Sequence, residues 1–528
     1  PVSAFPPDGT WPNGTSRFDK RALALDIPVW QPGLCVQCNF CSMICPHTAI
    51  QTRVFDPRHL DGAPTGFRSL PEAFEPALAG MEYVVQVAPE DCTGCGLCIE
   101  VCPAKDRRNP RRKALVSESL AEHREREREN FAFFRTLPPA ALDELPIDKR
   151  SAAFRTPLFE FSGACAGCGE TPYLRLLSQL FGDRLLVANA TGCSSIYGGN
   201  LPTTPWTVNA EGRGPAWSNS LFEDNAEFGL GMRLAVDGQL RRAHALLAEL
   251  APSLPEGWRT ALTSPAHSDK EISARRELLA SLRDWLRQTG SDTARALLEI
   301  CDVLVPRSVW IVGGDGWAYD IGYGGLDHVL ASGRKVNILV LDTEVYSNTG
   351  GQQSKATPLG AAAKFATAGK ATRKKDLGLL AMGYGHVYVA QVGIQSHSAQ
   401  TLKAMLEAEQ HPGPSLIIAH SPCIAHGYDL VNAPKQQKRA IDSGVWPLYR
   451  FDPARVTADD APLVLDSGPP RLDVERYMEN ETRFRMVELR SPERYRRLVD
   501  AARAAVHQRQ ALYEQLARIH LPKEESNG

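Results

Sequence analysis

The sequence predicts an α/β protein with a central sheet, preceded by a smaller domain rich in cysteine. Two apolar runs of strand length, 309–312 and 336–341, each enter a turn rich in glycine or polar residues. A helix-like segment is expected after the first turn, as in sheets whose strands alternate with helices. Two cysteine-rich stretches, 35–46 and 92–103, precede these strands and indicate the smaller domain.

The composition is typical of a globular protein with a hydrophobic core, because 43% of the 528 residues are hydrophobic and 23% are charged. This length is enough for roughly three or four domains. The net charge of -2 gives no indication of a nucleic-acid or anionic-membrane partner. No apolar run approaches the ~20 residues that span a bilayer, and the first residues lack the parts of a signal peptide. We therefore expect a cytoplasmic protein that binds neither nucleic acid nor membrane.

The first thirty residues, 1–30, are rich in proline, glycine and polar groups and are expected to form an N-terminal arm. Two copies of a C-x2-C-x2-C-x3-C-P run follow, at 35–46 and 92–103. Paired runs of this kind are the bacterial ferredoxin signature for two [4Fe–4S] clusters, since thiolates are soft, charged ligands that suit iron. We expect a small α+β domain of the bacterial 2[4Fe–4S] ferredoxin type over residues 31–120, with an insertion between the runs.

The fourth cysteine of each run is expected to bind the cluster of the other run. One cluster then uses Cys35, Cys38, Cys41 and Cys102, and the other uses Cys92, Cys95, Cys98 and Cys45. Zinc sites or free thiols are the alternative, which the doubled spacing and the proline after each run disfavour.

A basic run follows the second cysteine stretch and contains Arg107, Arg108, Arg111, Arg112 and Lys113. These residues could form a docking patch for an acidic electron carrier. A solvated surface loop explains the same composition, and we favour that simpler interpretation. Residues 121–160 are then predicted to be a helical linker, in which 122–129 alternate in charge as an exposed helix does.

A third group of cysteines, Cys165, Cys168 and Cys193, has no fourth member nearby. These residues could bind zinc, form a redox dithiol or do neither. The remaining candidates are Cys301, in an apolar helix-like stretch, and Cys423, just after the strand-like 416–418. Loops at strand ends are where α/β sheets place ligands, whereas a free cysteine in a helix packs as a small hydrophobe. We therefore select Cys423.

The turns after the two apolar runs carry candidate ligands for a phosphate and a metal. Glycines at 313, 314 and 316 allow the backbone to approach a pyrophosphate closely, and N–H groups at a helix start stabilise its charge. Asp315 is placed to hold a divalent metal that bridges phosphate oxygens. The second run ends in further oxygen ligands and the polar turn 347–351, and the pair of turns resembles the thiamine-diphosphate and magnesium motif.

The segments around these turns are predicted to be scaffold. Helical periodicity over about 230–300 places apolar residues on one face, among them Leu279, Leu282 and Leu286. The C-terminal extension, 431–528, ends in a charged helix from about 492 to 519, which we expect at a surface or a subunit contact.

Together these features resemble the C-terminal half of the pyruvate:ferredoxin (flavodoxin) oxidoreductases over nearly the whole chain. The most specific stretches are 1–15, the two cysteine runs, 190–200, 212–220 and 348–355. The resemblance implies a thiamine-diphosphate-binding α/β domain over residues 161–430. It also implies a third [4Fe–4S] cluster on Cys165, Cys168, Cys193 and Cys423.

The resemblance further implies which residues bind the cofactor. Magnesium is expected on Asp315, Thr343 and the carbonyl of Val345. Contacts to thiamine diphosphate are expected from Glu170, Cys193, Gly314, Asp315, Gly316, Trp317, Thr343, Glu344, Val345, Tyr346, Ser347 and Asn348, and Asn348 is also expected to act in catalysis. Residues 393–400 differ from the Gly-Ala-Asn-rich turn usual in the family, so no contact is assigned there.

The reaction implied by the resemblance is the oxidative decarboxylation of pyruvate to acetyl-CoA and CO2, with electrons passing through three [4Fe–4S] clusters to ferredoxin or flavodoxin. The family's other domains, which carry the glutamate that activates thiamine, the 2-oxoacid pocket and most of the coenzyme A site, are not in this chain. We therefore expect these N-terminal domains as a partner, and a homodimer of the complete enzyme.

Three other functions compete with this prediction. A related enzyme could act on a different 2-oxoacid, because the substrate pocket lies elsewhere. An electron-transfer subunit alone would have no need to combine Asp315, Thr343 and Asn348. A thiamine decarboxylase without electron transfer would leave the cysteines without a purpose.

Overall fold

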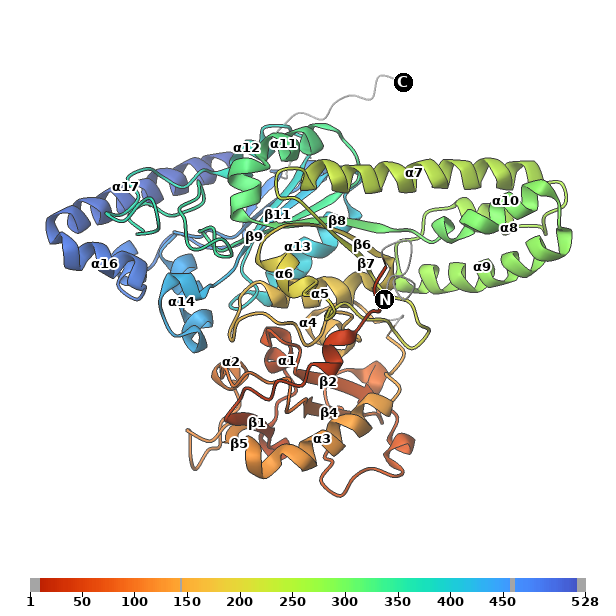
Figure 1. The fold of residues 1–528 in the computed structure, drawn as a ribbon, viewed down its shortest axis with the longest axis horizontal. Coiled ribbons are helices and arrows are strands. Elements are labelled where there is room, and N and C mark those ends of the chain that lie inside the picture. Colours follow the sequence, from red (N-terminus) through yellow and green to blue (C-terminus); the bar gives the residue numbers. More distant parts are fainter. Residues whose placement is uncertain (1–9, 143–144, 456–460, 520–528) are drawn as a thin grey trace.

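The computed structural model describes residues 10–142, 145–455 and 461–519 and is built around an eight-stranded sheet (Figure 1). The strands lie in the order β13-β12-β10-β11-β9-β8-β6-β7. Their bounds are β6 (Leu185–Ala190), β7 (Ala216–Ser220), β8 (Ser308–Gly314), β9 (Asn337–Asp342), β10 (Tyr388–Val392), β11 (Ser415–His420), β12 (Tyr449–Phe451) and β13 (Leu463–Leu465). The strands from β10 to β7 pair in parallel, whereas β12 and β13 pair antiparallel at one edge. The predicted α/β fold with a central sheet is confirmed, and the two apolar runs form β8 and β9.

Both faces of this sheet are covered by helices. In β8, Trp310 and Val312 belong to one hydrophobic cluster, and Ile311 between them belongs to the other. The first cluster includes residues of α5 (Thr171–Phe181) and α13 (Ser398–Gln410), and the second includes residues of α11 (Tyr323–Ala331), α12 (Leu377–Met382) and α17 (Pro492–Leu516). Strands buried on both faces are apolar at almost every position, which explains the uninterrupted runs in the sequence.

The cysteine-rich part forms a small α+β unit below the sheet in Figure 1. Its strands are β1 (Asp26–Trp30) and β5 (Leu115–Ser119), which pair with each other, and β2 (Ile50–Phe55), β4 (Glu82–Val87) and β3 (Leu70–Pro71), which form a second sheet. Its helices are α1 (Phe40–Ile44), α2 (Leu97–Val101) and α3 (Leu120–Thr136). The small α+β domain is thus present as predicted, and β1 extends it into the predicted arm. The first nine residues of that arm lie outside the described residues.

A group of helices extends from one side of the sheet in Figure 1 and has a hydrophobic cluster of its own. It consists of α7 (Asn225–Leu250), α8 (Trp258–Thr263), α9 (Asp269–Thr289) and α10 (Asp292–Ile300). The predicted apolar face of α9, with Leu279, Leu282 and Leu286, lies in this cluster. On the opposite side of the picture, α16 (Thr482–Arg490) and α17 form a helical pair.

The C-terminal segment is part of the large domain rather than an appendage to it. The predicted boundary at residue 430 falls between β11 and β12, which belong to the same sheet. The remaining helices are α4 (Lys149–Phe154), α6 (Cys193–Gly198), α14 (Ala433–Asp442) and α15 (Val474–Met478). No helix within the described ranges has the length and apolar character needed to cross a membrane.

The close packing of α7 on the sheet gives a paired prediction for two glycines of that helix. A Cβ at the buried Gly229 would lie 2.2 Å from Cγ1 of Ile311 on β8, whereas a Cβ at the exposed Gly231 would meet nothing within 4 Å. Gly229→Ala should destabilise the domain by about 1–3 kcal/mol through overpacking. Gly231→Ala should stabilise it by about 0.5–1 kcal/mol, because alanine favours the helix. Melting temperatures of the two variants should therefore shift in opposite directions, and equal shifts would contradict the packing described.

Candidate functional site at the carboxyl edge of the sheet

The candidate site lies where the parallel strands β6, β8, β9 and β11 end. The register places Gly314 of β8 beside Leu341 of β9, and Asp342 of β9 beside His420 of β11. The turns that follow these strands therefore meet at one edge of the sheet, which is where open α/β sheets bind ligands. Each of these turns carries a polar residue of the predicted site.

A cavity at this edge is lined by almost all of the residues predicted to contact the cofactor. These are Glu170, Cys193, Gly314, Asp315, Gly316, Trp317, Thr343, Val345, Tyr346, Ser347 and Asn348. Thr191, Gly192, Ser194, Phe222 and Thr349 also line it and were not predicted. Four of these five lie within two residues of Cys193 or Asn348 in the sequence, so their position beside predicted residues could have identified them. No sequence signal pointed to Phe222.

Glu344 is the one predicted contact that the structure places elsewhere. Its side chain is buried on the other side of the turn, with ion pairs to Lys374 and Arg483. The backbone of Glu344 is left-handed, with φ of 61°, which turns the side chain away from the cavity that Thr343 and Val345 line.

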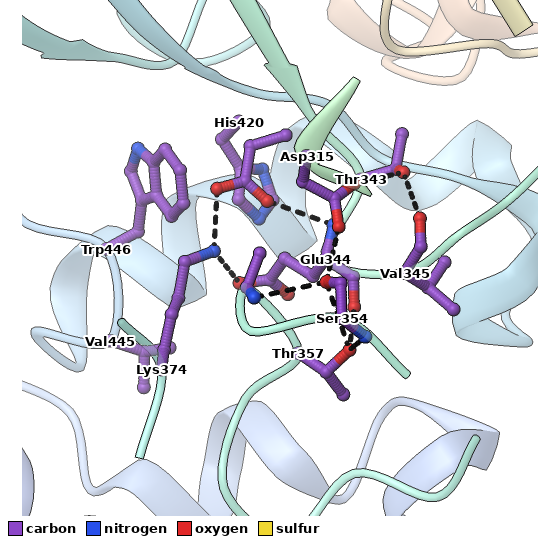
Figure 2. A network of polar contacts seen from close by, with 12 residues as sticks. Asp315, Thr343, Glu344, Val345, Ser354, Thr357, Lys374, His420, Val445 and Trp446 are labelled. Atoms are coloured by element: carbon purple, nitrogen blue, oxygen red, sulfur yellow. Dashed lines mark hydrogen bonds and ion pairs between the residues drawn. The ribbon is translucent and has the colours of Figure 1, made fainter. Parts of the chain in front are cut away.

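Three oxygen atoms converge at the base of the cavity (Figure 2). Thr343 Oγ1 lies 3.0 Å from Asp315 Oδ1 and 3.0 Å from the carbonyl oxygen of Val345. Adjacent ligands of an octahedral magnesium ion lie about 3 Å apart, because each metal–oxygen distance is about 2.1 Å. The spacing and the all-oxygen donor set therefore fit magnesium at the three residues predicted to hold it.

Burial of Asp315 also favours a cation at this point. Its carboxylate is 1% exposed and accepts a hydrogen bond of 2.5 Å from Ser354 Oγ, a partner that the sequence did not suggest. Burial, together with the nearby carboxylate of Asp342, raises the pKa of Asp315 to about 8. A divalent ion would favour the ionised form, because it supplies the positive charge that burial otherwise makes necessary.

Two glycines keep the cavity open for a bulky group. A Cβ at Gly314 would have no neighbour closer than the carbonyl oxygen of Leu341, at 3.9 Å, and a Cβ at Gly192 would have none within 4 Å. Both residues line the cavity, so side chains there would occupy it. Gly316, in contrast, is needed for packing, since its Cβ would lie 2.3 Å from the ring of Tyr346. The segment after Asp315 is a π-helix, Gly316–Ile321, a form often found at functional sites.

A second cavity, of about 160 Å3, shares a wall with the first. It is lined by the third predicted set of cysteines, Cys165, Cys168, Cys193 and Cys423. Glu170, Cys193, Thr343, Ser347 and Asn348 line both cavities. Burial raises the pKa of Glu170 to about 7, although the hydroxyl of Tyr197 donates to it at 2.9 Å.

The alternative fourth ligand, Cys301, lies elsewhere. It is 1% exposed, within the hydrophobic cluster of α7 to α10, and its thiol donates to the carbonyl of Leu298. Among the two candidates, only Cys423 lies with Cys165, Cys168 and Cys193.

The other eight cysteines of the two runs line two further cavities in the small domain. One is lined by Cys35, Cys38, Cys41 and Cys102, and the other by Cys45, Cys92, Cys95 and Cys98. The exchange of the fourth cysteine has a simple structural cause. Cys41 and Cys98 lie in the short helices α1 and α2, while Cys45 and Cys102 cap their ends, and the two helices pack together so that the end of each reaches the start of the other.

These cysteines are free thiols in groups suited to a cluster rather than to one ion. Within the described part of the chain, no three His, Cys, Asp or Glu side chains lie close enough together to bind a single metal ion. Burial raises the pKa of the Cys41, Cys98 and Cys168 thiols well above the usual value. Thiolates at these positions therefore require a positive group among them, which the iron of a cluster would supply.

The segment after Cys423 connects the cavity of the third cysteine set with the small domain. Leu430 lines the cavity of Cys423 and lies against Gly167, whose Cβ would be 2.6 Å from that of Leu430. The next residue, Val431, lies 3.1 Å from the Cβ position of Gly96, which lines the cavity of Cys95. Lys435 adds an ion pair of 2.6 Å to Glu100 on α2.

Comparison with known proteins agrees with this arrangement. The C-terminal TPP binding domain of thiamine pyrophosphate enzymes matches residues 298–419, a 4Fe-4S dicluster domain matches 34–105, and a domain of unknown function matches 1–24. A probable pyruvate-flavodoxin oxidoreductase from Escherichia coli (strain K12) is 54% identical over 528 residues, covering 100% of this chain. The chain matches the pyruvate-flavodoxin oxidoreductases over 98–100% of its own length.

The relatives differ in the electron acceptor that their names give. A pyruvate:ferredoxin oxidoreductase from Moorella thermoacetica is 47% identical over 98% of this chain. The chain spans 44% of the length of both relatives. A solved 2-oxoglutarate:ferredoxin oxidoreductase from Magnetococcus marinus covers 50% of this chain and 65% of its own, at 15% identity and a TM-score of 0.31, which is too low to support a structural argument.

The two candidate cysteines give a matched pair of variants. Reconstituted protein should contain about twelve irons per chain, at four per cluster. Cys423→Ser should lower this to about eight and reduce the melting temperature, because metal binding at a site made from distant segments contributes to folding. Cys301→Ser should retain about twelve irons. An iron loss in Cys301→Ser, with full iron in Cys423→Ser, would contradict the assignment of the third set.

Proposed function

We propose that this chain is the part of a pyruvate oxidoreductase that holds thiamine diphosphate by its diphosphate end and carries the electrons away. The complete enzyme would convert pyruvate and coenzyme A to acetyl-CoA and CO2 and reduce ferredoxin or flavodoxin. The observation that supports this most is the wall shared by the glycine-turn cavity and the cavity of Cys165, Cys168, Cys193 and Cys423. A two-electron oxidation that delivers single electrons needs such an acceptor directly beside the cofactor.

Each part of the site would have its own role in binding the cofactor. Thr343, Asp315 and the carbonyl of Val345 would hold magnesium, and the open backbone at Gly314 and Gly192 would receive the diphosphate. Thiamine diphosphate, when bound, supplies the electron sink that decarboxylation of a 2-oxoacid requires. Asn348 is exposed and lines both cavities, so we assign it to the reacting end of the site.

Three [4Fe–4S] clusters would form a path away from this site. The first would be bound by the set with Cys423, and the second by the set with Cys95, whose neighbour Gly96 lies against Val431 in the segment after Cys423. The third would be bound by the set with Cys41, a residue of α1, which packs against α2, the helix that contains Cys98 of the second set. The set of Cys35, Cys38, Cys41 and Cys102 is thus the last in the series and the expected exit for electrons.

The basic run of the sequence lies beside the cavity of this last cysteine set. Ala104 and Ala114, at the two ends of the run, line the last cysteine cavity. Between them Arg107, Arg108 and Arg111 are exposed, and Asp106 is the one acidic residue. Lys113 donates to the carbonyls of Ile99 and Glu100 and so ties the run to α2. This placement favours the docking interpretation over a plain solvated loop, with an acidic electron-carrier protein as the partner.

Two alternatives are less well supported. A structural role for the thiamine-like turns would explain the hydrogen bonds of Thr343, but it does not explain the cavity that Asp315, Thr343 and Asn348 line together. A different 2-oxoacid is compatible with this chain. We propose pyruvate because the relatives at 54% identity bear its name.

The proposal predicts that the chain has no sustained activity by itself. Protein with reconstituted clusters, given thiamine diphosphate, magnesium, pyruvate, coenzyme A and a viologen dye, should reduce the dye only after the remaining domains of a relative are added. The reason is that relatives are longer, since the chain spans 44% of their length. Sustained dye reduction by the chain alone would contradict the proposal that the remaining domains are required. A preference of the completed enzyme for 2-oxoglutarate over pyruvate would overturn the choice of substrate.

The basic run gives a second prediction. Arg107→Glu/Arg108→Glu should slow the transfer of electrons from the dithionite-reduced chain to an acidic flavodoxin about tenfold or more at low salt, because steering depends on complementary charge. The difference should shrink as salt rises. Arg496→Glu/Arg497→Glu, an equal change at exposed arginines of α17, should leave the rate unchanged. Equal slowing in both variants, measured by stopped-flow absorbance, would contradict docking at this run.

A further inference from the structure

Glu344 lies between two of the proposed magnesium ligands, Thr343 and Val345, and its backbone has an unusual conformation. Its φ of 61° is in the left-handed region. A residue with a Cβ adopts this region at a cost in free energy, so surrounding contacts must hold it there. The conformation brings the oxygens of its two neighbours together, since Thr343 Oγ1 and the Val345 carbonyl lie 3.0 Å apart.

The side chain of Glu344 is held by two cations. Lys374 Nζ lies 3.2 Å from one carboxylate oxygen, and Arg483 on α16 donates to the other at 2.6 Å. Each of its two carboxylate oxygens therefore has a cationic partner that compensates the burial of the carboxylate. Figure 2 shows Lys374 reaching Glu344 across the turn, beside Trp446.

The backbone of the same turn is fixed on both sides of Glu344. Its N–H donates to Asp342 Oδ1 at 3.0 Å, and its carbonyl accepts from Thr357 Oγ1 at 2.7 Å. His426 Nε2 lies 2.8 Å from the carbonyl of Thr343. The turn is therefore held through the backbone of Thr343 and Glu344 as well as through the Glu344 side chain.

We propose that Glu344 is a positioning residue for the cation site, and that α16 in the C-terminal segment takes part in building that site through Arg483. The ion pairs of the carboxylate anchor the left-handed turn, and the turn aims Thr343 and Val345 at one point. The identity of the cation rests on the proposed function, whereas the anchoring of the turn by Glu344 does not.

The network contains its own matched control. In Glu344→Gln, Lys374 keeps Asp342 at 2.8 Å and Arg483 keeps Glu481 at 2.6 Å, so neither cation is left unpaired. In Glu481→Gln, the same change is made to a carboxylate that is also 1% exposed and shares Arg483, while the pairs of Glu344 remain. A loss due to general destabilisation would affect both variants alike.

The test measures binding of Mn2+ to the whole chain, in the presence of inorganic pyrophosphate, by the electron paramagnetic resonance of free Mn2+. Glu344→Gln should weaken the affinity about tenfold or more, as changes behind a metal ligand commonly do. Glu481→Gln should retain the affinity of the unmodified chain. Equal affinities in the two variants would overturn the proposal.

Amide hydrogen exchange over residues 343–347 provides a second readout that needs no cation. Faster exchange in Glu344→Gln, but not in Glu481→Gln, would support the positioning role, and equal exchange would overturn it. Failure of the unmodified chain to bind Mn2+ would count against the proposed cation site, and in that case exchange alone would decide the role of Glu344.

Discussion

The carboxylate of Asp315, buried at the end of β8, is the constraint on which the rest of the site depends. Removing such a charge from water costs several kcal/mol unless hydrogen bonds and opposite charge compensate it. Here the compensating groups come from far along the chain: Thr343 after β9, Ser354 in the following loop, and the cation that the three oxygens would bind. The loops of the large domain are arranged to bring these groups to one point, and the parallel sheet makes this possible by ending its strands at a common edge.

A second layer of charge lies behind this point. Asp342 and Glu344 flank Thr343 in the sequence, and Lys374 pairs with both. Arg483 connects the layer to α16, 139 residues from Glu344. Because Lys374 and Arg483 each have two carboxylate partners, the layer can hold the turn in place before the metal binds. Pre-organisation of this kind lowers the cost of assembling a metal site.

The parts of this structure that could be predicted are those that local sequence specifies. Strands β8 and β9 were recognisable because burial on both faces gives uninterrupted apolar runs, and the exchanged cysteine sets followed from the spacing of the runs. The direction of Glu344 was not predictable, because one left-handed residue reverses its side chain and no sequence pattern marks it. The boundary at residue 430 was placed too early for the sheet because β12 and β13 have only three residues each, too few to show periodicity. The roles of Ser354, Lys374 and Arg483 depend on tertiary contacts, which single-sequence reasoning does not provide.

The short segment after β11 would influence the rate of electron transfer between the two domains, if both bind the proposed clusters. Cys423, Leu430, Val431 and Lys435 lie within thirteen residues of one another, yet they contact first the large domain and then α2 of the small one. The rate of electron tunnelling falls steeply with the distance between donor and acceptor. A hinge at this junction would therefore make the rate vary with the position of the small domain. Packing through Leu430 and Val431, in the loop after Cys423, would fix the gap between the proposed clusters by side-chain contact, so that electrons would cross between the two domains at a constant distance.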